Sequence, residues 1–271
     1  MISLDEACRV LAQIAPLRLA ESWDNVGLLV GDRRGSISRV ITCLTITPPV
    51  VAEAMEQSAD LIVAHHPLPF KPLQRITSDT TTGRMLLELI RSGVAIYSAH
   101  TAFDSAAGGI NQMWAERLQL TNTRPLIPES EEEPVDTDSV GSGRYGLLTS
   151  KTSLQQLAQN AAGSVGAKAP RLVGSADQHV QKVALACGSG GSFLSAAKRR
   201  GCDVMVTGEA TFHTCLEAEA SEIGLVLLGH YWSERFAMES LAEELGRELA
   251  GLTVWASREE RDPVAAVAQK H

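Results

Sequence analysis

The fold of the first half of the chain is decided by the stretch Asp60-Leu61-Ile62-Val63-Ala64-His65-His66-Pro67-Leu68-Pro69-Phe70. Its apolar run, residues 61–64, ends abruptly at two histidines and a proline, which predicts a buried strand. Pro67 has no N–H to donate to a sheet and keeps His66 extended. Imidazole is a common metal ligand at neutral pH. The two histidines therefore lie at the end of a predicted strand. They are either metal ligands or ordinary core or surface residues.

Apolar runs and helical stretches alternate through the rest of the chain, which predicts an α/β fold. The predicted strands are residues 27–30, 40–46, 61–64, 94–98, 183–187, 204–207, 225–228 and 252–255. The predicted helices are residues 4–14, 48–57, 83–92, 110–118, 193–200 and 233–249, with a further helix that starts near residue 153.

Two α/β units with largely parallel or mixed sheets are expected. Residues 1–124 and 222–271 form the first and residues 125–221 the second. The acidic stretch 129–139 is interpreted as a solvated loop or linker. A metal site is expected between the two units, at the carboxyl ends of their strands.

The composition is that of a globular protein, with 44% hydrophobic and 21% charged residues. A net charge of −8 disfavours direct nucleic-acid binding, which relies on clustered lysine and arginine. The five cysteines show no CxxC spacing, which favours a reduced, cytoplasmic protein without disulfides. Neither a signal peptide nor a membrane span is evident.

Histidines recur immediately after the apolar strands. Of the seven in the chain, five occupy such positions: His65, His66, His100, His213 and His230. Asp104 follows His100 by four residues, and Glu234 follows His230 by four, which brings each pair to one face if the turn is helical. Several imidazoles with two carboxylates suit zinc, manganese, iron or nickel better than calcium or magnesium. This number of ligands also permits two ions that share a carboxylate.

A glycine-rich turn, Cys187-Gly188-Ser189-Gly190-Gly191-Ser192, separates a predicted strand from a predicted helix. Such a turn can present backbone N–H groups to a phosphate or a carboxylate. It is not a P-loop, because no Gly-Lys-Ser/Thr follows. Anion binding and a plain tight turn are both compatible with the sequence.

Five motifs together resemble the NIF-three-like family, also labelled dinuclear-metal-centre hexameric proteins or GTP cyclohydrolase 1 type 2 homologues. They are Glu21-Ser22-Trp23-Asp24-Asn25-Val26-Gly27-Leu28, His65-His66-Pro67-Leu68-Pro69-Phe70, Ser98-Ala99-His100-Thr101-Ala102-Phe103-Asp104, the glycine-rich turn, and Gly229-His230-Tyr231-Trp232-Ser233-Glu234. The resemblance spans nearly the whole chain, and its most specific part is His-His-Pro with the downstream His-x-x-x-Glu.

The resemblance implies two divalent metal ions per subunit, with zinc, manganese, iron and nickel as candidates. It implies metal ligands at His65, His66, Asp104, His230 and Glu234, with Glu234 as the bridge. His100 and His213 would lie beside them as groups that transfer protons or position the ligands. A toroidal homohexamer is also implied. Thr45 stands where many relatives of this kind have an acid, so its contribution to the site is expected to differ.

The function that follows from this resemblance is a metal-dependent hydrolase that acts on a nucleotide-like substrate, such as the purine ring of GTP. The alternative is a hexameric metal-binding or adaptor protein without catalytic activity. A purely structural metal is disfavoured, because five ligands exceed a closed four-ligand site. Nucleotide turnover by the wild type and by Glu234→Gln distinguishes the enzyme from the adaptor.

Overall fold

The computed structural model describes residues 1–129 and 140–265, and its contacts divide the chain into two compact units. The first unit comprises Met1–Phe103 and Ala237–Arg261, and the second comprises Asp104–Phe236 with the residues from Asp262 onward. The sequence analysis divides the chain at residues 124 and 221 instead. Residues 222–236 group with the second unit because strand β12 (Gly224–Leu227) hydrogen-bonds into its sheet. The acidic stretch 130–139 lies outside the described residues.

The first unit is built on a sheet of five strands. In sheet order they are β13 (Thr253–Ala256), β4 (Arg39–Thr45), β5 (Leu61–His66), β6 (Ala95–Ser98) and β2 (Gly27–Val30). The first four run parallel to one another, and β2 is antiparallel to β6. A separate two-stranded ladder pairs β1 (Ile2–Ser3) with β3 (Ser36–Ile37). The predicted α/β unit with a largely parallel sheet is therefore confirmed.

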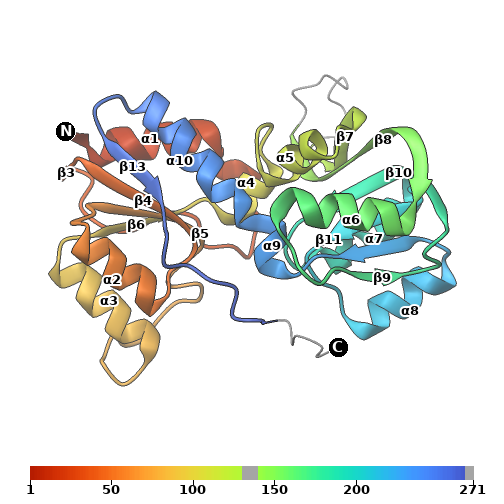
Figure 1. Ribbon diagram of the computed structural model, residues 1–271. Coiled ribbons are helices and arrows are strands. Elements are labelled where there is room, and N and C mark those ends of the chain that lie inside the picture. The colour runs from red at the N-terminus through yellow and green to blue at the C-terminus, as the bar shows by residue number, and fades with distance from the viewer. Residues whose placement is uncertain (130–139, 266–271) are drawn as a thin grey trace. The chain divides into compact units, whose positions relative to one another are not determined.

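Helices cover both faces of this sheet (Figure 1). They are α1 (Leu4–Ile14), α2 (Pro48–Glu56), α3 (Thr81–Arg91) and α10 (Phe236–Glu248). Helices α2 and α3 bury apolar side chains against Ile41, Ile62 and Ile96, while α1 and α10 cover the opposite face (Figure 1). Residues close in sequence determine where these helices begin. The Ser3 hydroxyl, for example, caps α1 by accepting a hydrogen bond from the N–H of Glu6 at 3.1 Å.

Strand β5 is longer than the sequence predicts. The apolar run ends at Ala64, but the ladder continues because His66 pairs with Thr45 of β4. Pro67 then ends the strand, as its missing N–H requires. Both histidines consequently belong to the sheet itself, so their backbone positions are set by the ladder rather than by a loop.

The second unit contains a mixed sheet of six strands. In sheet order they are β7 (Thr121–Pro128), β8 (Gly141–Ser153), β10 (His179–Ala186), β11 (Val204–Thr207), β12 and β9 (Arg171–Val173). The central strands β10, β11 and β12 are parallel, and the outer strands are antiparallel to their neighbours. The sequence analysis does not predict β7, which carries Pro125 and Pro128. Proline is tolerated there because β7 is an edge strand.

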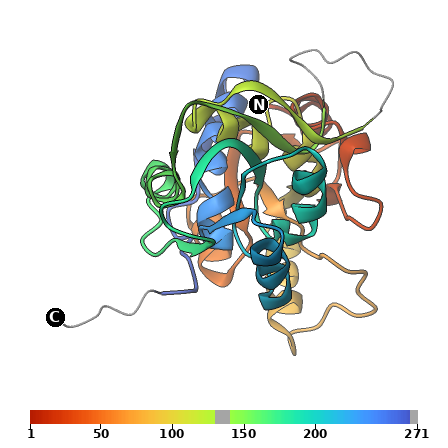
Figure 2. The same cartoon turned by 90° about the vertical axis from the view of Figure 1, so that its right-hand side faces the viewer.

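Helices lie on both sides of the central strands of the second unit. The helices of this unit include α5 (Ile110–Arg117), α6 (Leu154–Val165), α7 (Leu194–Arg199), α8 (Phe212–Ala220) and α9 (His230–Glu234). Helices α6 and α7 flank the sheet on opposite sides (Figure 2). Apolar residues of α7 and α8, such as Leu194 and Ala218, are packed in one buried cluster with Met205 and Leu225 of the sheet.

Two short helices lie where the sequence analysis expects a loop or a longer helix. Helix α4 (His100–Ser105) spans the point at which the units divide. The helix predicted over residues 233–249 is two helices, α9 and α10, and α9 begins directly after Gly229 (φ +92°). Among the described residues, no helix combines the length and the apolar character needed to cross a membrane.

Candidate metal centre

Three histidines gather at the carboxyl ends of β5 and β6 in the first unit. His65 and His66 end β5, and His100 opens α4 two residues beyond β6. Each of the three offers one ring nitrogen, and these ligand atoms lie within 4.8 Å of one another. Parallel strands place their carboxyl ends on one edge of a sheet, which is why residues distant in sequence meet here. The three imidazoles are a set of nitrogen donors suited to a transition-metal ion.

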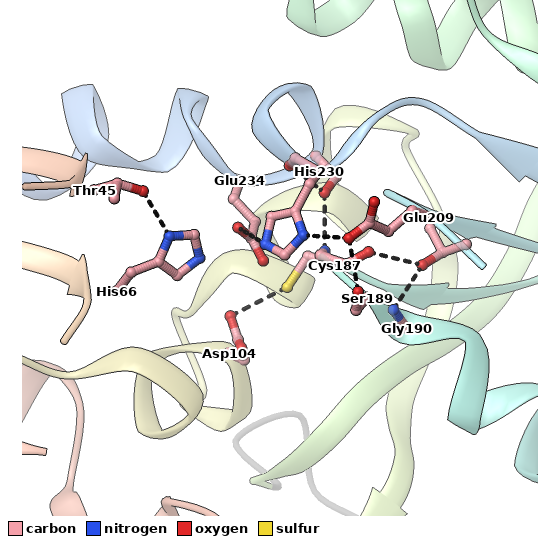
Figure 3. A network of polar contacts seen from close by, with 12 residues as sticks. Thr45, His66, Asp104, Cys187, Ser189, Gly190, Glu209, His230 and Glu234 are labelled. Carbon is pink, nitrogen blue, oxygen red and sulfur yellow. Dashed lines mark hydrogen bonds and ion pairs between the residues drawn. The ribbon is translucent and has the colours of Figure 1, made fainter. Parts of the chain in front are cut away.

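The orientation of His66 is set by a neighbouring strand. The Thr45 hydroxyl lies 2.7 Å from Nδ1 of His66 (Figure 3). The backbone N–H groups of Leu44 and Thr45 donate to the carboxylate of Glu260, which is only 9% exposed. With Nδ1 engaged by Thr45, Nε2 is the ring nitrogen that can bind an ion. The neutral hydroxyl of Thr45 thus positions the predicted ligand His66, and Glu260 from the C-terminal segment holds the backbone of Thr45 in place.

His100 is held by Asp24, which lies in the motif of residues 21–28. Oδ1 of Asp24 lies 2.7 Å from Nδ1 of His100, and Oδ2 accepts hydrogen bonds from the backbone N–H and the hydroxyl of Thr101. Burial raises the pKa of Asp24, but the hydrogen bonds from His100 and Thr101 outweigh it and lower that pKa to about 2. His100 also has φ +33°, a strained backbone conformation for a residue other than glycine. The carboxylate therefore fixes the imidazole in one orientation.

Replacing Asp24 with asparagine is expected to destabilise the first unit by about 2 kcal/mol at pH 7. The folded pKa of Asp24 is depressed, so its carboxylate stabilises the fold above the unfolded pKa. This stabilisation is lost as the pH falls through about 2. Urea denaturation of both proteins between pH 7 and pH 2.5 measures the difference. Asp32→Asn, at an exposed loop position, is the control and should change little. A difference that stays constant over this pH range contradicts the assignment.

A chain of three side chains forms the corresponding cluster in the second unit (Figure 3). Nδ1 of His230 lies 2.8 Å from Oε1 of Glu209, and Nε2 lies 3.1 Å from Oε2 of Glu234. The hydrogen bond to Glu234 raises the pKa of His230 to about 9 despite burial, with Glu209 adding to the effect. A carboxylate on one ring nitrogen, with the other nitrogen turned toward a second acid, is the arrangement that orients histidine ligands in metal sites.

Asp104, another acid of the second unit, lies next to the thiol of Cys187. Its Oδ1 lies 3.1 Å from Sγ of Cys187 (Figure 3). Asn111 links the same two residues, because its amide donates to the carbonyl of Asp104 and its Oδ1 accepts the N–H of Cys187. Burial, together with the charges of Asp104 and Glu234, raises the pKa of the Cys187 thiol well above its usual value. Cys187 is therefore a protonated donor that positions Asp104 rather than a thiolate.

Two N–H groups of the glycine-rich turn after β10 donate to nearby side chains of the second unit. The N–H of Gly188 donates to the Ser233 hydroxyl at 2.9 Å, and that of Gly190 donates to the Thr207 hydroxyl at 3.1 Å. Gly188 has φ +60°, and a Cβ added to it would lie 2.2 Å from Oε1 of Glu234. Of the two interpretations left open by the sequence, these contacts favour a tight turn, which lets the backbone approach Glu234 closely.

The structure places most of the predicted site residues in these clusters. His65, His66 and His100 meet in the first unit, and His230 pairs with Glu234 in the second. His213 is exposed on α8, and its ring contacts that of its neighbour Phe212. The predicted catalytic role of His213 therefore gains no geometric support within the second unit.

Two residues of the clusters escape the sequence analysis, Asp24 and Glu209. Glu209 does carry a signal, because it follows β11 by two residues, as His230 follows the neighbouring strand β12 by three. Asp24 lies within the motif of residues 21–28, but nothing in that motif indicates a contact with His100, which is 76 residues away in sequence.

The side chains of both units match the chemistry of a transition-metal site. Imidazole nitrogens and carboxylate oxygens suit zinc, manganese, iron or nickel, whereas calcium takes oxygen ligands only. The partners that fix His66, His100 and His230 are the hydroxyl and carboxylate groups that metal ligands commonly require. The residues present therefore fit divalent ions.

Comparisons with known proteins identify relatives of this chain. The chain is 34% identical over 263 residues to a protein called GTP cyclohydrolase 1 type 2 homolog from Clostridium perfringens, which covers 97% of this chain and 98% of that protein. It is 33% identical to NIF3-like protein 1 of Drosophila melanogaster, with 95% and 87% covered. The crystal structure of a Bacillus cereus protein related to NIF3 matches with a TM-score of 0.88 and 25% identity, over 98% of this chain and 99% of that one. The model of the family described as Duf34/NIF3 (NGG1p interacting factor 3) matches residues 2–263, and the chain belongs to that family.

Proposed function

We propose that this protein binds two divalent metal ions and uses them to hydrolyse a nucleotide-like substrate. The metal ligands proposed are His65, His66, Asp104, His230 and Glu234, with Glu234 as the bridge. The observation that carries the proposal is the group of three imidazoles at the ends of β5 and β6, whose ring nitrogens lie within 4.8 Å of one another. Two of them, His65 and His66, are proposed ligands, and the third, His100, is a neighbouring group. Relatives that are called GTP cyclohydrolase 1 type 2 homolog support a nucleotide as the substrate class.

Ions bound at these residues would supply Lewis-acid activation of water and of the bond under attack. The contribution of the chain is to hold the ligands in place. Glu209 orients His230, Thr45 orients His66, and Cys187 donates to Asp104. Ligands fixed in this way bind an ion in one geometry and leave a position for the substrate.

His100 is proposed as the proton-transfer group of the site. Its Nδ1 is occupied by the carboxylate of Asp24, so Nε2 is the nitrogen that exchanges a proton with a reacting group. A buried carboxylate that stays ionised stabilises the imidazolium formed when His100 accepts that proton. The His100–Asp24 pair is thus suited to general base and general acid steps in turn.

The wider assembly and location are also proposals. A toroidal homohexamer follows from the family resemblance, and a cytoplasmic location is consistent with the five free cysteines. The alternative function, a metal-binding adaptor without catalysis, is favoured by the family description as an interacting factor. Both functions share bound metal and differ in turnover.

The test is metal-dependent loss of GTP and of a nucleotide panel with wild type and Glu234→Gln. We expect turnover that requires added zinc, manganese, iron or nickel and that falls at least 100-fold in the variant. Glu217→Gln, an exposed acid on α8, is the matched control and should retain turnover. No turnover of any nucleotide by metal-loaded wild type would instead support the adaptor.

A further inference from the structure

A pocket of about 340 Å³ lies beside the glycine-rich turn in the second unit. Its size falls within the range of pockets that take small organic ligands. It is lined by Ser189, Gly191, Ser192, Glu209, Ala210, Thr211 and Thr214. Glu209 is the residue that links this pocket to the candidate metal centre, because it also holds His230.

The two carboxylate oxygens of Glu209 have different surroundings. Oε1 accepts a hydrogen bond from the Ser189 hydroxyl at 2.8 Å, and it also lies 2.8 Å from Nδ1 of His230. Oε1 is therefore saturated, whereas no described residue donates a hydrogen bond to Oε2. Glu209 lines the pocket, and its Oε2 is therefore the carboxylate oxygen left to accept a hydrogen bond from a ligand.

The charge of the lining residues disfavours a phosphate as the occupant. Among the described residues, neither lysine nor arginine lines the pocket, and Glu209, an acid, is the charged side chain there. In the adjoining turn, the N–H of Gly190 is already donated to Thr207. Thr211 and Thr214 hydrogen-bond to each other, at 2.9 Å between their hydroxyls. A phosphate would face net repulsion here, whereas a ligand with N–H groups would meet an acceptor.

We propose that this pocket binds the N–H-donating edge of a nucleobase, with Oε2 of Glu209 as the acceptor. The proposal deepens the function proposed above and rests on it for the substrate class. Any phosphate of the substrate would lie outside this pocket. Because Glu209 also holds His230, the residue that contacts the base is the one that positions a metal ligand.

Guanosine is the probe of choice, because its N1–H and N2–H groups are adjacent donors, either of which can donate to Oε2 of Glu209. Binding is measured by calorimetry on the full chain after removal of metal with EDTA. We expect guanosine to bind, and tripolyphosphate neither to bind nor to compete. Ala210→Phe, which fills the pocket, should weaken guanosine binding more than tenfold, and Ser195→Phe, at an exposed position outside the pocket, should not.

Two results would overturn this inference. One is competition by tripolyphosphate, and the other is guanosine binding that is absent or unaffected by Ala210→Phe. Because binding is measured without metal, its outcome is independent of turnover. Guanosine binding without metal-dependent turnover would support the pocket assignment and reject the hydrolase. Metal-dependent turnover without guanosine binding in this pocket would support the hydrolase and reject the pocket assignment.

Discussion

Gly188→Ala is expected to remove metal binding at Glu234 while the fold persists. A Cβ at this position would lie 2.2 Å from Oε1 of Glu234 and 3.3 Å from Nε2 of His230. Contacts under 3 Å are not tolerated, so the carboxylate must move away. Because an ion is bound at about 2 Å, even a shift of about 1 Å removes a ligand from its position. We expect the metal content of the purified protein to fall from two ions per chain to one or none.

The matched control for this variant is Gly201→Ala. Gly201 has φ +66°, close to the φ of Gly188, but nothing lies within 4 Å of its added Cβ. Both variants therefore carry a similar backbone cost of about 1 kcal/mol, and only one disturbs Glu234. Metal analysis of both proteins, with thermal unfolding, separates the two effects. Equal metal content in Gly188→Ala and Gly201→Ala would show that the close approach of Gly188 to Glu234 is not needed for metal binding.

Arg144→Met is expected to destabilise the second unit by about 3 kcal/mol. Arg144 is 1% exposed and donates to the carbonyls of Gly141, Gly143 and Ala106 at 2.7–2.8 Å. Burial lowers its pKa to about 10, so it remains charged at neutral pH. Methionine fills a similar volume but leaves three buried carbonyls without this donor. Relief from burying a cation offsets part of that loss.

Chemical denaturation at pH 7 measures this effect. Arg124→Met is the control, because Arg124 is exposed on β7 of the same sheet and the substitution should change little there. Since Ala106 lies two residues after Asp104, Arg144→Met should also loosen the segment that carries this predicted ligand. A change in unfolding free energy for Arg144→Met no larger than for Arg124→Met would show that Arg144 has no such role.

The α/β core was predictable because its signals are local. The strand before Pro67 and the helix capped by Ser3 each depend on neighbours in sequence, and the structure confirms both. The exact end of β5 was not predictable, since it depends on pairing with Thr45 across the sheet. Strand β7 was not predictable because its prolines argue locally against a strand. They are tolerated only because β7 lies at the edge of the sheet.

The candidate site was predictable to the extent that its residues follow strands. Histidines at the end of β5 and just after β6 and β12 stand out in the sequence because, within each sheet, parallel strands place their carboxyl ends on one edge. The groups that orient them stand out less. Glu209 follows a strand as the histidines do, but the contacts of Glu209 with His230 and of Asp24 with His100 become recognisable only in the structure. Such partners are set by tertiary packing and leave no periodic pattern.

We propose that ligands from distant parts of the chain meet around two cations, which anomalous diffraction from crystals grown with zinc or manganese can test. We expect two ions per chain, each about 2 Å from a ring nitrogen of His65, His66 or His230 and both in contact with Glu234. Imidazoles of His65 and His66 that lie more than about 12 Å from every Glu234 carboxylate, in the same or a neighbouring subunit, would contradict it, because no bridged pair of ions spans that distance.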